Sequence, residues 1–209
     1  MRPFSRQKNN KPIRDNFYLH KSGFLIKAAF LFFTTFFRRI IMGFFIPDKR
    51  FRRITEIDCE YLKQKDIQGL ILDVDNTLST HHSQTPLTGL SEWLDEMKKN
   101  GIKLIILSNS KKERVAPFAN KLGLDFISLG LKPLPFGLIR AKRKLGLKAK
   151  NAAMVGDQIF TDIIGANSCG LNTILLEPIK LEDGKSFKIR RKLEKRFIAK
   201  YERKAANER

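Results

Sequence analysis

Two hydrophobic patterns alternate along residues 54–184 of the chain. Short, continuous apolar runs are typical of strands buried on both faces of a parallel sheet, whereas apolar residues at intervals of three or four are typical of helices that pack with one face. The predicted strands are 69–78, 102–110, 124–129, 151–158 and 172–176. The predicted helices that separate them are 86–100, 111–122 and 138–145. This alternation predicts an α/β fold with a doubly wound, mostly parallel sheet.

Polar residues gather where the predicted strands end. The apolar part of the first strand ends at Asp73 and Asp75. The second strand runs into Ser108 and Asn109, and the fourth ends at Asp157. The carboxyl ends of parallel strands meet at one edge of a sheet, and ligands of such sheets bind beyond that edge. We therefore expect these side chains to form one site.

Two further polar residues lie in the loops beyond the strand ends. Lys132 precedes a proline after the third strand, and Asp162 completes a GDxxxxD arrangement that starts at Gly156. Each feature alone is weak, because an Asp-x-Asp is commonly a turn and a lysine before proline is usually solvated. Together they place several carboxylates at the mouth of a buried sheet, which is costly without compensation. A divalent cation and a phosphate group would supply that compensation.

In this order, the motifs resemble those of the haloacid dehalogenase superfamily of phosphohydrolases. The segments that carry the resemblance are DVDNTL (73–78), LSNS (107–110), KPL (132–134) and VGDQIFTDIIGAN (155–167). More closely, the chain is similar to the subfamily IIIA proteins related to phosphatidylglycerophosphate phosphatase. The resemblance covers about residues 46–200 and implies the Rossmann-like fold of that superfamily.

The resemblance implies a catalytic role for each acidic residue. Asp73 would be the nucleophile that forms an aspartyl-phosphate, and Asp75 would act first as a general acid and then as a general base. Mg²⁺ would be bound by Asp73, by Asp157 and by the backbone carbonyl of Asp75. Ser108 and the backbone amide of Asn109 would donate hydrogen bonds to the phosphoryl oxygens, and Lys132 would neutralise their charge. The supporting residues would be Thr77, Gly156 and Asp162.

The spacing of the motifs predicts a site without a cap domain. Residues 79–101 and 111–131 each hold one predicted helix, and each is far shorter than the ~50 residues of a small domain. An open site suits a substrate that is too large to enclose, such as a phosphorylated headgroup at a bilayer, a phosphoprotein or a nucleic acid end. His81 and His82, in the loop beyond the first motif, are expected to be a solvated pair rather than metal ligands or bases.

Charge divides the chain into three parts. The protein has 209 residues and a formal net charge of +20. Residues 1–53 carry 13 Lys/Arg against 2 Asp/Glu, and residues 185–209 carry 11 against 3, whereas the middle is nearly neutral. We predict a basic, Phe-rich arm over 1–46, a phosphatase domain over 47–184 and a basic C-terminal helix over 185–209. Cationic ends indicate an anionic partner.

The segment 24–46 is expected to contact a membrane surface. Its longest charge-free run has ten residues, fewer than the ~20 that span a bilayer as a helix. On a helix, several phenylalanines lie opposite a narrow stripe of Lys27, Thr34 and Arg38, which suits a helix lying in the membrane interface. Packing on the protein itself, a dimer contact and a spanning anchor are the alternatives. The predicted location is the cytoplasm, peripheral on the inner face of the membrane.

Three functions are compatible with these features. The first is a Mg²⁺-dependent phosphatase acting on phosphatidylglycerophosphate at an anionic phospholipid membrane. The second is the same chemistry on a soluble phosphomonoester. The third is an RNA- or ribosome-binding factor, which the charge would also suit. No RNA-binding motif is apparent, and the cations lie beside phenylalanine runs, which disfavours nucleic acid as the partner.

Overall fold

The computed structural model describes residues 43–80, 83–180 and 184–207. The chain divides into two compact units, residues 1–42 and residues 43–209, and the described residues all belong to the second. The predictions for most of the N-terminal arm, and for His81 and His82, therefore lie outside the described residues.

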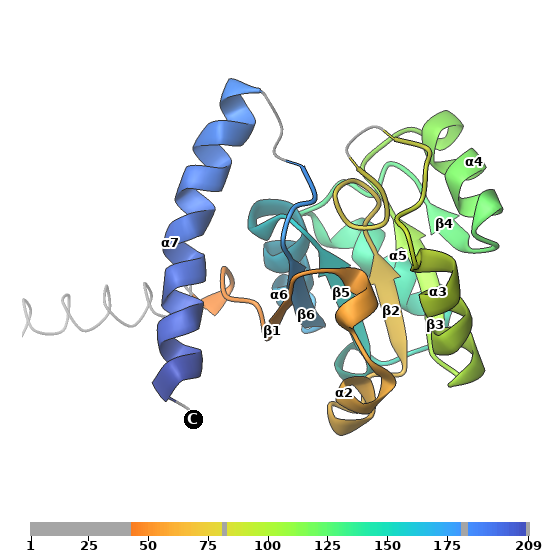
Figure 1. Cartoon of the computed structure of the whole chain (residues 1–209), viewed down its shortest axis with the longest axis horizontal. Helices are drawn as coiled ribbons and strands as arrows, with labels where there is room; N and C mark the ends of the chain where they lie inside the picture. The colour runs from red at the N-terminus through yellow and green to blue at the C-terminus, as the bar shows by residue number, and fades with distance from the viewer. Residues whose placement is uncertain (1–42, 81–82, 181–183, 208–209) are drawn as a thin grey trace, which may run out of the picture. The chain divides into compact units, whose positions relative to one another are not determined.

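Six parallel strands form one sheet in the order β1-β6-β5-β2-β3-β4 (Figure 1). Their bounds are β1 Lys49–Phe51, β2 Gly69–Leu72, β3 Lys103–Leu107, β4 Asp125–Ile127, β5 Ala152–Gly156 and β6 Asn172–Leu176. The chain runs outward from β2 to β3 and β4, then returns to the other side of β2 to form β5 and β6. This confirms the predicted doubly wound parallel sheet, and its reversal point lies beside β2, where such sheets bind ligands.

Helices connect the strands. The α-helices are α2 Cys59–Gln64, α3 Leu90–Lys99, α4 Lys112–Lys121, α5 Pro135–Leu145, α6 Ile164–Ser168 and α7 Lys185–Asn207. Short 3₁₀ turns occur at η1 Ile54–Glu56 and η2 Ala149–Asn151, and η3 Ile159–Ile163 is a π-helical turn. Helix α5 begins three residues before its predicted start because Pro135 has the backbone geometry of a first helical position and lacks the amide hydrogen that would be unpaired there.

The core consists of two apolar layers, one on each face of the sheet. Leu70 and Leu72 of β2 belong to the layer that includes residues of α3 and α4. Ile71, which lies between them, belongs to the other layer with residues of α5 and α6. Successive strand side chains point to opposite faces, so the continuous apolar run of β2 is buried on both sides. This packing fixes the carboxyl end of β2, where the acidic motif begins.

The basic C-terminal segment forms α7, which packs on η3 through aromatic residues. The ring of Phe197 stacks on Phe45 at 4.5 Å between centroids and meets Phe160 edge-on at 6.1 Å. Ile159 and Ile163 of η3 lie in the same apolar cluster. Within the described residues, no helix combines the length and apolarity needed to cross a membrane.

Candidate active site

A cavity of about 190 Å³ lies at the carboxyl ends of β2, β3 and β5. It is lined by polar residues from five segments that are distant in the sequence. These are Asp73, Asp75, Ser108, Asn109, Ser110, Lys132, Gln158, Thr161 and Arg190. The structure therefore brings both predicted catalytic residues and all three predicted phosphate-binding residues to one cavity. Asp157 and Asp162 do not line the cavity, but each has an oxygen within 4.8 Å of an oxygen of Asp73, which does.

Lys132 joins two carboxylates at the base of the cavity. Its Nζ lies 2.6 Å from Oδ1 of Asp73 and 2.7 Å from Oδ1 of Asp162, and all three side chains are buried. Burial lowers the pKa of Lys132, but Asp162 and Asp73 outweigh it and the pKa is raised. Burial raises the pKa of Asp73 to about 7, against the opposing charge of Lys132. The ammonium group is thus fixed in its charged form beside the predicted nucleophile.

The Asn109 side chain holds the backbone of Lys132. Asn109 Oδ1 accepts a hydrogen bond from the Lys132 amide at 2.7 Å, and Asn109 Nδ2 donates to the Lys132 carbonyl at 2.9 Å. Ser108 Oγ accepts from the Ser110 amide at 3.1 Å, which shapes the same turn. The side chain of Asn109 is therefore used in positioning Lys132, and a contact with phosphate would come from its backbone amide.

Asp157 is anchored by the C-terminal helix. Arg191 of α7 pairs with Asp157 Oδ2 and donates to the Asp157 carbonyl at 2.7 Å. Glu194 pairs with Arg191 at 2.9 Å and accepts a hydrogen bond from the Ile159 amide at 2.8 Å. Side chains of α7 therefore hold the turn that follows β5 in place. Burial raises the pKa of Asp157 well above its usual range, although Arg191 opposes this. Asp157 Oδ1 is buried and has no hydrogen-bond partner among the described residues.

Three carboxylates converge closely enough to share one cation. One oxygen each from Asp73, Asp157 and Asp162 lie within 4.8 Å of one another. Gly156 permits this approach, because a Cβ at that position would lie 2.4 Å from Asp162 Oδ2. Carboxylate oxygens are the ligands that Mg²⁺ prefers, and the unpartnered Oδ1 of Asp157 fits a ligand atom. The chemistry of these residues therefore fits a magnesium ion, with Asp162 offered as a third carboxylate.

Asp75 is held by Arg114 of α4. The guanidinium group binds both carboxylate oxygens, with Nη1 at 2.9 Å from Oδ2, and the same Nη1 donates to Ser110 Oγ at 2.6 Å. Thr77, two residues after Asp75, is buried, and its hydroxyl has no hydrogen-bond partner among the described residues. The predicted acid–base residue thus lies at the cavity wall in a fixed orientation.

Three arginines of the site were absent from the sequence prediction. Arg114 lies 39 residues from Asp75, and Arg191 lies 34 residues from Asp157. Arg190 lines the cavity from α7. In a chain with 41 Lys/Arg, no sequence signal separates these three from solvated cations on the same helices. Only the packing of α4 and α7 identifies them.

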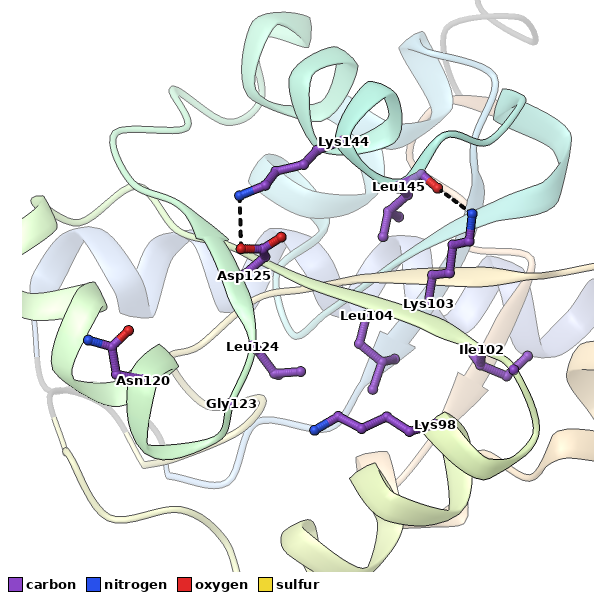
Figure 2. A pocket seen from close by; sticks show the side chains of 11 residues that line it. Lys98, Ile102, Lys103, Leu104, Asn120, Gly123, Leu124, Asp125, Lys144 and Leu145 are labelled. Carbon is purple, nitrogen blue, oxygen red and sulfur yellow. Dashed lines mark hydrogen bonds and ion pairs between the residues drawn. The ribbon is translucent and has the colours of Figure 1, made fainter.

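A second hollow lies at the opposite edge of the sheet, where β3 and β4 begin (Figure 2). It measures about 930 Å³, and Figure 2 shows two of its lysines, Lys144 and Lys103, paired with groups of the protein itself. Lys144 pairs with Asp125 at 3.0 Å, and Lys103 donates to the Leu145 carbonyl at 2.9 Å. The carboxylates of the predicted site do not contribute to this hollow, which makes the smaller cavity the candidate active site.

Comparison with known proteins gives consistent matches. Residues 35–170 match the family described as "Hydrolase: haloacid dehalogenase-like hydrolase". The chain is 38% identical over 165 residues to "Probable phosphatase YqeG" of Bacillus subtilis, which covers 79% of this chain and 96% of that protein. It is 26% identical over 145 residues to "Phosphatidylglycerophosphate phosphatase 1, chloroplastic/mitochondrial" of Arabidopsis thaliana, covering 65% of this chain and 42% of that protein. A solved structure of an uncharacterized protein from Listeria monocytogenes is 26% identical, with a TM-score of 0.47 over 57% of this chain and 84% of that one.

Proposed function

The chain belongs to the haloacid dehalogenase-like hydrolase family and is a phosphatase of that family, and we propose that its activity depends on Mg²⁺. We propose further that its substrate is the phosphomonoester phosphatidylglycerophosphate, hydrolysed at the inner face of the membrane. The observation that carries the proposal is the buried Asp73, paired with Lys132 and grouped with two further carboxylates at the base of a polar cavity.

The proposed reaction uses two carboxyl groups in turn. An oxygen of Asp73 attacks phosphorus, the bond from phosphorus to the ester oxygen breaks, and Asp75 donates a proton to the departing alkoxide. Asp75 then takes a proton from water, the water oxygen attacks phosphorus, and phosphate leaves Asp73 as a free carboxylate. Arg114 holds Asp75 at the cavity wall, so we expect the carboxyl group of Asp75 to exchange this ion pair for the ester oxygen during proton donation.

The remaining residues supply charge neutralisation and positioning. Lys132 and the backbone amide of Asn109, with the hydroxyl of Ser108, would bind the phosphoryl oxygens. Asp73, Asp157 and the backbone carbonyl of Asp75, with Asp162 as a further carboxylate, would hold Mg²⁺, which when bound would neutralise charge on the phosphoryl group. Arg191 keeps Asp157 in place, and Asn109 does the same for the backbone of Lys132.

The choice of substrate has three supports. Two matched proteins are phosphatidylglycerophosphate phosphatases, although the identity is 26% in each case. The motifs leave no room for a cap domain, which suits a headgroup presented at a surface. The net charge of +20 favours residence at anionic lipid.

The test measures phosphate release from phosphatidylglycerophosphate in mixed micelles and from small phosphate esters, with Mg²⁺ and with chelator. We expect Mg²⁺-dependent turnover of the lipid, abolished in Asp73→Asn because an amide is a poor nucleophile. Asp95→Asn, which changes an exposed carboxylate on α3, is the matched control and should keep full activity. Efficient turnover restricted to the soluble esters would instead assign the same chemistry to a soluble phosphomonoester.

A further inference from the structure

Exposed apolar side chains gather beside the active-site cavity. Six of them lie on two segments that also supply cavity residues, and we call these six the apolar rim, comprising Leu129, Leu131, Leu134, Phe136, Ile189 and Leu193. The first four lie in the loop after β4 and the start of α5, and the other two lie on α7. Phe44 is the one other large apolar side chain exposed in the described part of the chain. Nearly all the large exposed apolar side chains in the described part of the chain therefore lie on segments that border the cavity, as expected of an interaction surface.

The rim borders the cavity on two sides. Lys132, which lines the cavity and pairs with Asp73, lies between Leu131 and Leu134 in the sequence, yet it is buried while these two leucines are 56% and 51% exposed. Arg190 lines the cavity from α7, and Ile189, which precedes it, is 63% exposed. The segments that supply cavity residues therefore also present apolar side chains to the outside.

The backbone conformation of residues 129–131 keeps Lys132 buried and the neighbouring leucines exposed. Leu129 and Leu131 have φ values of 47° and 55°, a strained left-handed conformation that residues other than glycine rarely adopt. Gly130, between them, packs so tightly that an added Cβ would lie 2.7 Å from Leu107 Cδ1. The fold thus maintains a strained turn in which Lys132 points inward and the leucines point outward, although the leucines gain no burial from it.

Charge around the rim favours an anionic bilayer as its partner. The loop 108–111, the segment 129–136 and the first nine residues of α7, 185–193, contain seven Lys/Arg and no Asp/Glu, and two of the seven, Lys132 and Arg191, are paired with carboxylates of the site. The exposed cations among them include Lys111 and Lys188. Apolar side chains surrounded by cations suit the interface of an anionic membrane. A second copy of the chain would bring like charges together across a symmetric contact, which disfavours self-association.

We propose that the apolar rim enters the headgroup region of an anionic bilayer, so that the cavity opens toward phosphorylated headgroups at the membrane surface. This inference rests on the proposed lipid phosphatase function and adds the surface through which the active site would meet its substrate. It assigns membrane contact to the phosphatase domain itself.

The test places tryptophan in the rim of the full-length chain. Phe136→Trp, at a position 61% exposed, is compared with Asn120→Trp, at an exposed position beside the hollow at the opposite edge of the sheet (Figure 2). Vesicles of phosphatidylglycerol and phosphatidylcholine carry brominated acyl chains, which quench tryptophan inside the bilayer. The native Trp93 is buried and gives the same background in both proteins. We expect a blue shift and quenching for Phe136→Trp and neither for Asn120→Trp.

Several results would overturn the proposal. Vesicle binding without selective quenching of Phe136→Trp would assign the contact to another part of the chain, and absence of vesicle binding would refute a membrane surface altogether. A concentration-dependent blue shift of the same variant without vesicles would show that a second copy covers the rim.

A rim variant gives an independent measurement. Leu131→Ser combined with Leu134→Ser should bind vesicles about tenfold or more weakly, since each leucine contributes on the order of 1 kcal/mol of apolar transfer, while hydrolysis of p-nitrophenyl phosphate stays unchanged. Unaltered vesicle affinity would contradict the proposal. If phosphatidylglycerophosphate in detergent micelles is hydrolysed but the tryptophan is not quenched, the rim fails and the proposed function stands. If the lipid is not hydrolysed in any form, the function itself fails.

Discussion

Asp73 and Lys132 form the central pair of the site, and their burial sets its electrostatics. Removing a carboxylate from water is costly, so Asp73 retains a proton more readily than a solvated aspartate, even with the ammonium group 2.6 Å away. Asp162, on the other side of Lys132, adds further negative charge. A metal-free cluster of this kind carries an excess of carboxylates, and a bound cation would relieve it.

The raised pKa of Asp73 predicts how stability depends on pH in the metal-free protein. Because burial raises this pKa from 3.8 to about 7, the folded state binds more protons than the unfolded state across that interval. The free energy of unfolding should therefore fall as pH rises from about 4 to about 7. We expect the fall to be smaller in Asp73→Asn, which cannot ionise. Urea unfolding of both proteins in chelator, across this range, measures the difference, and parallel pH profiles would contradict it.

At the residue scale, sequence reasoning located the acids better than the arginines. The motifs placed Asp73, Asp75 and Ser108 at strand ends and Lys132 in a loop beyond one, and the sheet brings them to one cavity because parallel strands share an edge. Family membership confirms the resemblance that those motifs indicated. The partner of Asp75 could not be predicted, because Arg114 occupies an ordinary helical position and its role depends on how α4 packs.

Helix α7 is the element that links the C-terminal segment to the site. Arg191 contacts the carboxylate and the carbonyl of Asp157, and Glu194 braces Arg191 while accepting from the Ile159 amide. The helix also buries Phe197 against Phe45. The segment predicted to be a basic C-terminal helix therefore also orients Asp157, a predicted metal ligand.

Removal of this brace should weaken metal binding. Groups that orient a ligating carboxylate typically contribute 10–100-fold to metal affinity. We expect Arg191→Gln to raise the Mg²⁺ concentration at the midpoint of the metal-induced rise in Tm by about tenfold or more. Lys192→Gln removes one charge from an exposed neighbouring position and should leave the midpoint unchanged. Equal midpoints for the two variants would show that Arg191 does not position Asp157.

The first turn of α5 fixes the position of the loop that carries Lys132. Gly137, in its first turn, packs so closely that an added Cβ would lie 2.3 Å from the carbonyl oxygen of Gly130. Gly137→Ala should therefore displace this loop and lower the free energy of unfolding by about 1–3 kcal/mol, as overpacking does, with a loss of activity. Gly43→Ala, where an added Cβ meets nothing within 4 Å, is the control. Wild-type stability in Gly137→Ala would contradict the close packing described.

At the element scale, the predicted strands and helices are all present in the predicted order, and the structure adds β1, α2 and α6, which were not predicted. Strand β1, Lys49–Phe51, is three residues long and mostly charged, so it has no strand periodicity and is identified only by its pairing with β6. The turn η3, Ile159–Ile163, is π-helical, a form that has no sequence signature. The apolar β2 is the opposite case, since its burial on both faces produces an unbroken apolar run.

The whole molecule combines a nearly neutral core region with strongly basic flanking segments. The net charge of +20 is distributed so that cations border the active-site cavity as well as the chain ends. Electrostatic attraction to anionic lipid acts over roughly 8–10 Å at physiological salt and is screened beyond that. Charge would thus concentrate the protein at a membrane, while the buried site would perform the chemistry.

This division predicts that the hydrolysis rates of two substrates differ in their sensitivity to salt. Hydrolysis of phosphatidylglycerophosphate in phosphatidylglycerol vesicles should fall severalfold as NaCl rises from about 0.05 to 0.5 M, because screening releases the protein from the surface. Hydrolysis of p-nitrophenyl phosphate should change little over the same range. Phosphate release from both substrates in parallel provides the measurement. Equal sensitivity would place the salt effect in the active site and not at the membrane.

The most direct test of the account is to trap the phosphorylated protein. The protein is mixed with phosphatidylglycerophosphate and Mg²⁺, quenched in acid within milliseconds, digested and examined by mass spectrometry. The account predicts one phosphoryl group on the peptide that contains Asp73, formed before free phosphate accumulates and absent from Asp73→Asn. Continued turnover with no phosphoryl group on that peptide, or with one on another residue, would contradict it.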